Sequence, residues 1–319
     1  MDHRLDSARR PGRSTRALVR VTALASLASL AALAGCSSDM PAAAPDAAPE
    51  VAPPDADLVA ARPYRTVVPT SYVAGVPMPM LILLHGYGGD ATDVDTYYGF
   101  SALAESAGFL GVLPNGIPDS SHYRAWHVSP VHAAPWDVEY LRGVMTDVQS
   151  KYTVDPLRIY VMGLSQGAHM AHRLGCDVAS KVAAFASHAG QVKKEPQYCA
   201  PTEAVSALEI HGTYDATIGY DGDVQNDPPD PTIPSAHETI GVWGRNDACT
   251  GPIARTGERM DLVKDLAGDE TYVEAYGGCP AGIGAELWTI EQGVHRPDIT
   301  STFLAQVYRF LSAHPKPAK

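Results

Sequence analysis

A serine, an aspartate and a histidine each follow an apolar segment of the sequence, in the order Ser165, Asp215, His295. A neutral serine hydroxyl attacks an ester carbonyl only when a base takes its proton, and a histidine can take that proton and return it to the leaving alcohol. An aspartate beside the histidine holds the imidazole in the useful tautomer and stabilises its cation. These three residue types therefore predict acyl transfer through a nucleophilic serine.

The surroundings of Ser165 strengthen this prediction. Residues 163–167 read Gly-Leu-Ser-Gln-Gly, after the apolar run 159–162 and before the helix-compatible residues 168–174. A Gly-x-Ser-x-Gly pattern on a strand-to-helix turn is the nucleophile elbow of α/β-hydrolases, in which a strained serine projects its hydroxyl above the sheet. The five-residue pattern also arises by chance, so the neighbouring elements and the later Asp and His must support it.

Other residues could serve as the acid or the base. Asp215 could belong only to an Asx turn, in which case Asp221 or Asp223 would be the acid. We favour Asp215 because it lies where the predicted strand 207–212 ends, after Thr213 and Tyr214. His237 and His188 compete as the base. We favour His295 because it lies between the last predicted strand and the last predicted helix.

A glycine-rich turn follows the continuous apolar segment 80–84 and reads His85-Gly86-Tyr87-Gly88-Gly89. Backbone N–H groups in such a turn can face a ligand, as an oxyanion hole requires. The N–H groups of Tyr87 and Gln166 are the expected oxyanion donors. His85 and His211, each placed before a glycine at the end of a predicted strand, are expected to brace turns.

These residues need a sheet that collects the ends of its strands at one edge. Strand-like and helix-like segments alternate along the chain, which predicts a mostly parallel central sheet with helices on both faces: an α/β fold of the α/β-hydrolase kind. The predicted strands are 62–69, 80–85, 109–114, 159–162, 182–186, 207–212 and 286–290. The predicted helices are 97–107, a helix capped by Asp137 that runs to Tyr152, 168–174, and a closing helix with Ile299, Phe303, Val307, Phe310 and Leu311 on one side.

The first 61 residues look different from the rest. Residues 1–35 combine six arginines with a short apolar run, as an export signal does, and residues 33–36 read Leu-Ala-Gly-Cys, as in a lipobox whose Cys36 becomes lipidated. An ordinary signal peptide ending at small residues is the alternative. Residues 36–61 are rich in Ala, Pro and Asp and are expected to form a tether. Residues 62–319 would then form one catalytic domain.

Charge and cysteine content limit the partners and the compartment. Removal of residues 1–35 takes away six Arg and two Asp, which changes the net charge from −12 to about −16. This acidic chain is not expected to bind nucleic acid, and its only expected membrane contact is the lipid anchor. The four remaining cysteines, Cys176, Cys199, Cys249 and Cys279, predict two disulfides in an exported protein, with three connectivities open, or else buried free thiols.

No metal or cofactor is expected. His169 and His172 are three residues apart but lack the glutamate of a zinc-protease motif. A segment that begins at Asp221 resembles a calcium loop only weakly, because it lacks the required glycine and has Thr232 at the twelfth position.

The chain resembles secreted esterases that include polyhydroxybutyrate depolymerases and the feruloyl and acetylxylan esterases of carbohydrate esterase family 1. The similar segments are residues 62–65, 83–89, 108–116, 137–141, 154–167, 211–215 and 243–249. The resemblance implies that Ser165, Asp215 and His295 are nucleophile, acid and base. It also implies disulfides Cys176–Cys199 and Cys249–Cys279.

Two positions depart from the family pattern. Ala168 replaces a frequent glycine, and Arg296-Pro297 replaces an aromatic Trp-Pro after the catalytic histidine, so the substrate stays open. The expected protein is a lipid-anchored or secreted monomeric esterase whose ester substrate can be polymeric. The alternatives are an acyl transferase or serine peptidase on the same fold, or a catalytically silent surface-binding protein.

Overall fold

The computed structural model describes residues 55–129, 136–192, 198–222 and 234–318. The predicted export signal, Cys36 and the tether up to residue 54 lie outside these residues, and so do Asp223 and most of the calcium-like segment. No helix within the described ranges is both long and apolar enough to cross a membrane.

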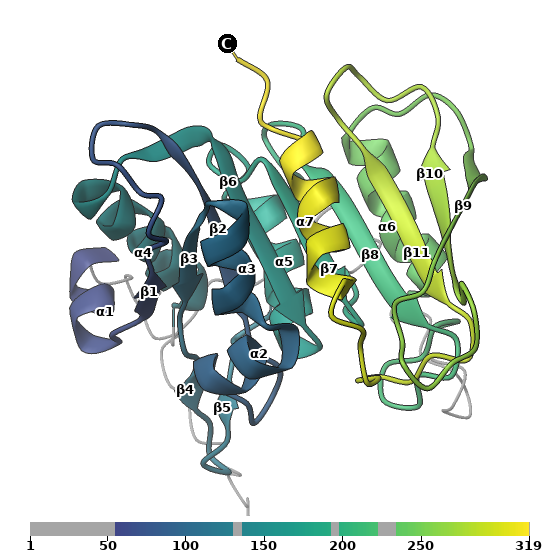
Figure 1. The fold of residues 1–319 in the computed structure, drawn as a ribbon, viewed down its shortest axis with the longest axis horizontal. Coiled ribbons are helices and arrows are strands. Elements are labelled where there is room, and N and C mark those ends of the chain that lie inside the picture. The colour runs from purple at the N-terminus through teal and green to yellow at the C-terminus, as the bar shows by residue number, and fades with distance from the viewer. Residues whose placement is uncertain (1–54, 130–135, 193–197, 223–233, 319) are drawn as a thin grey trace, which may run out of the picture. The chain divides into compact units, whose positions relative to one another are not determined.

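The described strands form a nine-stranded sheet in the order β1-β3-β2-β6-β7-β8-β11-β10-β9 (Figure 1). The strands from β3 to β11 in this order are parallel, whereas β1 at one edge and the pair β10 and β9 at the other run antiparallel to their neighbours. This confirms the predicted mostly parallel sheet. The bounds are β1 Arg65–Val67, β2 Met78–Leu84, β3 Leu110–Leu113, β6 Val154–Leu164, β7 Ala184–His188, β8 Ser206–Gly212, β9 Ile253–Met260, β10 Thr271–Tyr276 and β11 Ala285–Ile290.

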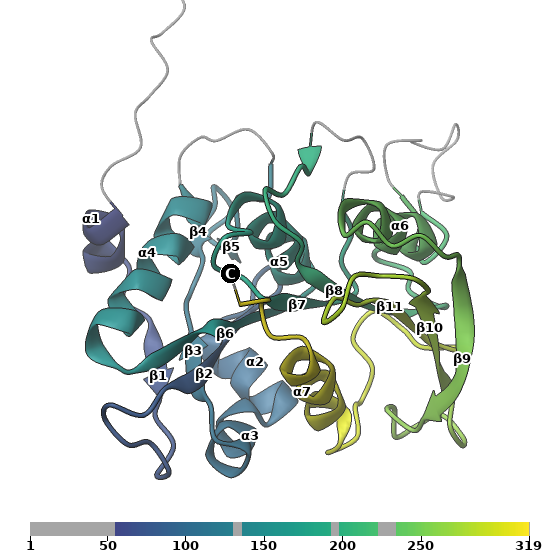
Figure 2. The same ribbon diagram turned by 90° about the horizontal axis from the view of Figure 1, so that it is seen from above.

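Helices cover both faces of the sheet (Figure 2). One face carries α2 (Ala91–Tyr98), α3 (Phe100–Ala107) and α7 (Phe303–Ala313), and the other carries α4 (Asp137–Lys151), α5 (Gln166–Asp177) and α6 (Ala236–Asn246). Successive side chains of a strand point to opposite faces, so the continuous apolar run of β2 serves both layers. Met80, Ile82 and Leu84 belong to the core under α4 and α5, while Leu81 and Leu83 belong to the core under α2, α3 and α7.

The single helix predicted over residues 97–107 is wrong, because the chain forms two helices that meet at Gly99. This glycine has a φ of 62°, in the left-handed region that a continuous α-helix cannot contain.

The prediction that Asp137 caps α4 is also wrong. Trp136 occupies the cap position, and the Asp137 carboxylate is used by tertiary bonds to Nη1 of Arg62 (2.6 Å) and to the backbone N–H of His127 (2.5 Å).

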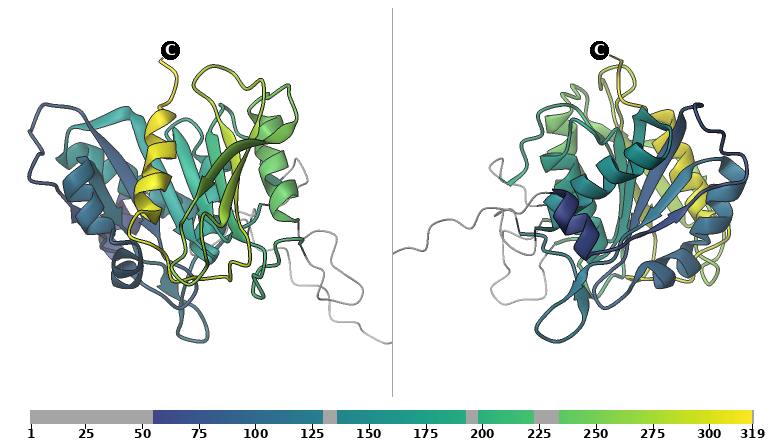
Figure 3. Two further views of the ribbon diagram at one scale, coloured as in Figure 1. Left: turned by 45° about the vertical axis from the view of Figure 1, so that its right-hand side comes forward. Right: turned by 90° about the vertical axis from the view of Figure 1, so that its left-hand side faces the viewer.

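The tether prediction fails over its last seven residues, which form α1 (Asp55–Ala61). This helix lies against α4, as the right-hand view of Figure 3 shows. Asp55 makes a bidentate ion pair with Arg142, both contacts at 2.9 Å, and Leu58 and Val59 pack against the core. The packing of Leu58 and Val59 and the Asp55–Arg142 ion pair thus hold this segment in place, although its composition alone predicts a linker.

Three elements in the C-terminal third of the chain were not predicted from the sequence: α6, β9 and β10. Strands β9 and β10 form an antiparallel ribbon at the sheet edge beyond β11. Between β3 and α4 the described chain also forms two short paired strands, β4 (Ile117–Pro118) and β5 (Arg124–Ala125). Ile299 was expected on the closing helix, but it lies before α7 and pairs with Val263 in an isolated bridge.

Candidate active site

Ser165 lies between the end of β6 and the start of α5, in a strained backbone conformation. Its φ and ψ are 55° and −119°, a combination that costs a non-glycine residue on the order of 1–3 kcal/mol. A Cβ added to Gly163 would lie 2.0 Å from the carbonyl oxygen of Gly167, so the turn closes only with glycine at that position. The Ser165 N–H donates to the carbonyl of His188 at 2.9 Å, which fixes the turn to β7. The structure therefore has the elbow geometry that the sequence pattern predicts.

Asp215 and His295 lie on two loops that are bonded to each other beyond β8 and β11. The N–H of Tyr214 donates to the carbonyl of Gly293 at 2.8 Å. Nδ1 of His295 lies 2.7 Å from Oδ2 of Asp215. A carboxylate only accepts hydrogen bonds, so Nδ1 carries the proton and Nε2 is left as the basic nitrogen. This is the tautomer that a general base for a serine needs.

Asp215 is also an Asx-turn residue, and its place in that turn is compatible with its contact to His295. Its Oδ1 accepts the N–H groups of Thr217 (2.8 Å) and Ile218 (2.9 Å), and its Oδ2 faces His295. Burial alone would raise the pKa of Asp215, but the bonds to His211 and His295 hold it well below the usual range. Asp215 is therefore an anion with a fixed orientation.

The competing residues lie elsewhere or are engaged otherwise. Asp221 is exposed. His237 pairs with Glu274 at 3.0 Å, on α6 and β10. His188 is buried, its Nδ1 lies 2.7 Å from the hydroxyl of Tyr98, and burial lowers its pKa to about 3. Of the candidates within the described residues, His295 is the one that contacts Asp215 as a partly exposed imidazole.

Ser165 shares with these two residues the edge of the sheet at which the parallel strands end. The strands β6, β7, β8 and β11 are consecutive and parallel, so Ser165 after β6, Asp215 after β8 and the loop after β11 all lie at their carboxyl ends. The Ser165 hydroxyl makes no hydrogen bond to a described residue. Catalytic hydrogen bonds of this kind are often long in the free enzyme and tighten when substrate binds.

His85 fixes the glycine-rich turn in front of Ser165. The N–H of Gly116 donates to Nε2 of His85 at 2.9 Å, so the proton of this neutral ring is on Nδ1, which donates to the carbonyl of Gly86 at 2.7 Å. Burial lowers the pKa of His85, which keeps the ring neutral. The carbonyl of Gly86 and the N–H of Tyr87 belong to one planar trans peptide and point in opposite directions. The expected turn-bracing role of His85 thus has a specific form: it sets the direction of the Tyr87 N–H.

Gln166 and Gly86 place both expected oxyanion donors beside the serine. A Cβ on Gly86 would lie 3.3 Å from Cβ of Ser165, so this turn passes directly over the elbow. Gln166 is the first residue of α5, where backbone N–H groups have no partner within the helix. Within the described residues, the N–H groups of Tyr87 and Gln166 donate to no protein acceptor. The Gln166 side chain is tied back, since its Oε1 accepts the Trp126 N–H at 2.9 Å.

Behind Asp215 lies a buried polar cluster that was not predicted from the sequence. His211 contacts Glu209 and Asp215, and Glu209 in turn contacts His172. The sequence predicts only a turn-bracing role for His211 and offers His172 only as a weak candidate for a metal ligand. The signal that could have found the cluster is a glutamate in the interior of the apolar strand 207–212, because an ionisable residue in a buried strand needs a partner.

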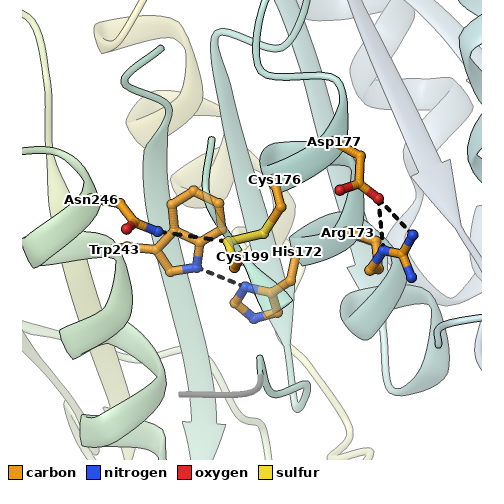
Figure 4. Close-up of a disulfide and its surroundings, with 7 residues drawn as sticks. All are labelled: His172, Arg173, Cys176, Asp177, Cys199, Trp243 and Asn246. Atoms are coloured by element: carbon orange, nitrogen blue, oxygen red, sulfur yellow. Dashed lines mark hydrogen bonds and ion pairs between the residues drawn. A yellow bond between two sulfur atoms is a disulfide. The ribbon is translucent and has the colours of Figure 1, made fainter. Parts of the chain in front are cut away.

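The structure joins Cys176 to Cys199 and Cys249 to Cys279, the pairs that the family resemblance implies. Cys176 is on α5, one turn after His172, and Figure 4 shows the disulfide next to the indole of Trp243. This disulfide thus ties the elbow helix to the segment before β8. Within the described residues, no group of three or more His, Cys, Asp or Glu side chains has an arrangement that could hold a metal ion.

Comparison with known proteins gives the following matches. A family model described as "Esterase PHB depolymerase" matches residues 64–234. Feruloyl esterase B of Piromyces equi is 28% identical over 234 residues, which cover 71% of this chain and 41% of that protein. The chain therefore spans less than half the length of this relative. Among solved structures, an acetyl xylan esterase from Aspergillus awamori has a TM-score of 0.57 at 14% identity, with 78% of this chain and 93% of that one covered. Esterase PE8 has a TM-score of 0.50 at 17% identity, with 79% and 99% covered. These two structures support the fold assignment.

Proposed function

This chain belongs to the esterase PHB depolymerase family, and from that premise we propose that it hydrolyses carboxylic esters through an acyl-serine intermediate. The observation that carries the proposal is the bond between Nδ1 of His295 and the buried anion Asp215, because it leaves Nε2 of His295 basic. The strained turn of Ser165 at the same sheet edge supplies the nucleophile. His295 lies beyond the residues that the family model matches, so its role rests on this geometry.

The proposed reaction has two halves. In the first, Oγ of Ser165 attacks the ester carbonyl while Nε2 of His295 takes the hydroxyl proton, and the tetrahedral intermediate collapses as His295 returns that proton to the leaving alcohol. In the second, water attacks the acyl-serine with His295 again as base, which releases the acid and restores the hydroxyl. Asp215 stabilises the His295 cation in both halves.

The N–H groups of Tyr87 and Gln166 would bind the oxyanion of each tetrahedral intermediate. Both lie beside Ser165 without a described protein acceptor, and the Gln166 N–H is at the positive end of the α5 dipole. A donor of this kind is worth about 3–4 kcal/mol in the transition state. His85 contributes indirectly, by holding the Gly86–Tyr87 peptide in place.

Exposed hydrophobic side chains belong to site residues or to their neighbours in the chain, and they suit a large or aromatic ester. Tyr87, Tyr214 and Val294 are exposed to 51%, 65% and 50%, and each is a site residue or its direct neighbour in the chain. The ring of Tyr123 lies 5.6 Å from that of Tyr87, centroid to centroid. We name Tyr87, Tyr123, Tyr214 and Val294 the rim. The rim supports a substrate with an apolar surface, either a polyester or a feruloyl ester on polysaccharide.

The proposed location is extracytoplasmic. The two disulfides support an oxidising compartment. The export signal in residues 1–35 and the lipidation of Cys36 remain sequence-based proposals, as do attachment to a bacterial membrane and the monomeric state. Labelling of intact cells with a lipid precursor, compared between wild type and Cys36→Ser, tests the anchor.

The decisive experiment compares wild type with Ser165→Ala in the hydrolysis of p-nitrophenyl butyrate and in labelling by a fluorophosphonate probe. We expect the variant to lose both, with a fall in kcat of roughly 10⁶-fold. Hydrolysis at the wild-type rate by Ser165→Ala would exclude the mechanism. A substrate panel of methyl ferulate, acetylated xylan and polyhydroxybutyrate film then identifies the acid and the alcohol. Peptide cleavage, or transfer to a sugar in preference to water, would favour a peptidase or an acyl transferase.

A further inference from the structure

Four buried polar side chains continue inward from Asp215. Glu209 and His211 are on β8, His172 is on α5 and Trp243 is on α6, and all four are almost fully buried. Nε2 of His211 lies 3.3 Å from Oδ2 of Asp215, and Nδ1 of His211 lies 3.0 Å from Oε1 of Glu209. An ionisable pair in the middle of a buried strand is costly unless its charges are compensated, so its protonation state can be worked out from its partners.

His211 faces only hydrogen-bond acceptors. Nδ1 faces the Glu209 carboxylate, while Nε2 faces both the carbonyl of Ile218, at 2.9 Å, and the Asp215 carboxylate. A ring nitrogen must carry a proton to donate, so both nitrogens of His211 are protonated and the ring is a cation. Burial alone would lower the pKa of His211, but the bonds to Asp215 and Glu209 raise it to about 10.

Trp243 and His172, at the end of the cluster away from Asp215, determine which hydrogen bond Glu209 accepts there. Nε1 of Trp243 can only donate, and it lies 2.9 Å from Nδ1 of His172 (Figure 4). Nδ1 of His172 is therefore the acceptor, and its Nε2 carries the proton toward Oε2 of Glu209 at 3.2 Å. Each oxygen of Glu209 thus has its own donor, one neutral and one charged. The bonds to His172 and His211 keep the pKa of Glu209 low despite its burial.

Among the residues that the structure describes, the other titratable groups near this pair do not supply a second buried cation. Burial lowers the pKa of His188 on β7 to about 3 and that of His169 on α5 to about 4, so both are neutral. Tyr220 stays protonated, because burial raises the pKa of its hydroxyl, which lies 2.8 Å from Oγ1 of Thr289. Arg296 is partly exposed and pairs with Asp93 at 2.8 Å. Within the described residues, His211 is thus the buried cation in contact with Asp215.

Two histidines therefore share one oxygen of Asp215. Nδ1 of His295 lies 2.7 Å from Oδ2, and Nε2 of His211 lies 3.3 Å from the same atom. During acyl transfer His295 becomes a second cation on that oxygen. Like charges repel in a poorly solvated site, so the permanent charge of His211 makes the charged form of His295 less favourable than a lone Asp–His pair would.

We propose that the Glu209–His211 ion pair is a positioning device for the acid, which holds Asp215 from behind and limits how strongly His295 retains the proton taken from Ser165. The proposal rests on the roles proposed above for Ser165, Asp215 and His295. A base that held the proton too strongly would be slow to return it to the leaving alcohol. Glu209 and His211 are not catalytic residues, because neither reaches the reacting atoms.

The first test is the pH dependence of kcat/KM for p-nitrophenyl butyrate in Glu209→Gln and His211→Gln. Both variants weaken the positive charge beside Asp215: His211→Gln removes it, and Glu209→Gln removes one of the two carboxylates that keep His211 charged. His295 then becomes the more basic group, and we expect the acidic limb of the profile to move to higher pH by on the order of one unit. A purely structural role predicts a lower rate at every pH with the limb in place, and that result would overturn the proposal.

The matched control is His237→Gln. His237 also pairs with a glutamate, Glu274, at 3.0 Å, but this pair is partly exposed and does not touch Asp215. We expect its profile to coincide with that of the wild type. A shift in this control equal to that of His211→Gln would show that loss of any histidine–glutamate pair moves the limb, and it would also overturn the proposal.

A second measurement depends neither on catalytic activity nor on whether the Glu209 and His211 variants fold. Nitrogen-15 spectra of the histidine rings, recorded on folded Ser165→Ala protein, report the protonation of each ring nitrogen. We expect His211 to remain doubly protonated from about pH 5 to about pH 9, whereas an isolated histidine would titrate inside that range. A neutral His211 at neutral pH would overturn the proposal. If the wild type hydrolysed no ester, the proposed function would fail, but these spectra would still decide the state of the ion pair.

Discussion

Nδ1 of His295 lies 2.7 Å from Oδ2 of Asp215, although 80 residues separate the two in the sequence. The contact exists because β8 and β11 are parallel neighbours, so the loops that follow them leave the sheet side by side. It determines the tautomer of His295 and supports the proposal that Asp215, and not the exposed Asp221, is the acid.

Asp215→Asn should lower kcat for p-nitrophenyl butyrate by about 10⁴-fold with little change in KM, because an amide can donate to Nδ1 and so favours the wrong tautomer. Asp221→Asn is the control, since Asp221 is exposed in the same loop and was the alternative acid. Steady-state kinetics of both variants check this. Equal losses in the two variants would remove Asp215 from the mechanism.

Replacement of the rim tyrosines should change substrate preference rather than chemistry. Tyr87→Ala keeps the backbone N–H, and Tyr214→Ala leaves Asp215 in place, so we expect p-nitrophenyl acetate hydrolysis to stay within about threefold of wild type. Loss of an aromatic contact worth about 1 kcal/mol should reduce kcat/KM for methyl ferulate or polymer film roughly fivefold. The control is Val76→Ala, which changes an exposed residue in the turn before β2, at the other end of that strand. Unchanged preference in both tyrosine variants would show that the rim does not contact substrate.

Asp247 should make the protein less stable as pH rises. Its carboxyl is buried, its Oδ1 accepts the Val205 N–H at 2.9 Å, and its Oδ2 has no partner within the described residues. Burial raises its pKa to about 7, although the Val205 bond and the Lys316 charge oppose this. The folded state thus binds this proton more tightly than the unfolded state, so stability is full below the unfolded pKa of about 4 and is lost as pH rises through about 7.

Asp247→Asn removes this titration. We expect it to raise the free energy of unfolding by up to about 4 kcal/mol at about pH 8 and to change it little at about pH 4. Denaturant unfolding at both pH values checks the expectation, with exposed Asp265→Asn as the control. An equal gain in the free energy of unfolding at both pH values would mean that ionisation of the Asp247 carboxyl does not cause it.

Loss of the Cys176–Cys199 disulfide, in Cys176→Ser/Cys199→Ser, should lower the free energy of unfolding by about 3 kcal/mol, as expected for a loop of this size. The bridge spans 23 residues and the Cys249–Cys279 bridge spans 30, so the second double variant should lose a similar amount. Thermal unfolding measures both. Peptide mapping without reductant tests the pairing itself, and a peptide that joins Cys176 to Cys249 would contradict it.

Much of the fold could be read from the sequence because its signals are local. The apolar run of β2, the strand before Ser165 and the strand before Asp215 are continuous apolar segments, and their alternation with helices predicts the parallel sheet. The predictions failed where one residue or one tertiary contact decided the outcome. Gly99 divides one expected helix into two, and the ion pair of Asp55 with Arg142 holds a helix where composition predicts a tether.

For the site, the sequence by itself determined the residue types and their order: a serine on an elbow, then an aspartate, then a histidine, and a glycine-rich turn before them. Only the tertiary structure decided which aspartate meets which histidine, because that contact depends on the order of β8 and β11 in the sheet. It also decided that His211 is more than a turn residue. The charge of His211 depends on Glu209, two residues before it, and on Asp215, four residues after it, and a sequence shows the spacing but not which atoms face one another.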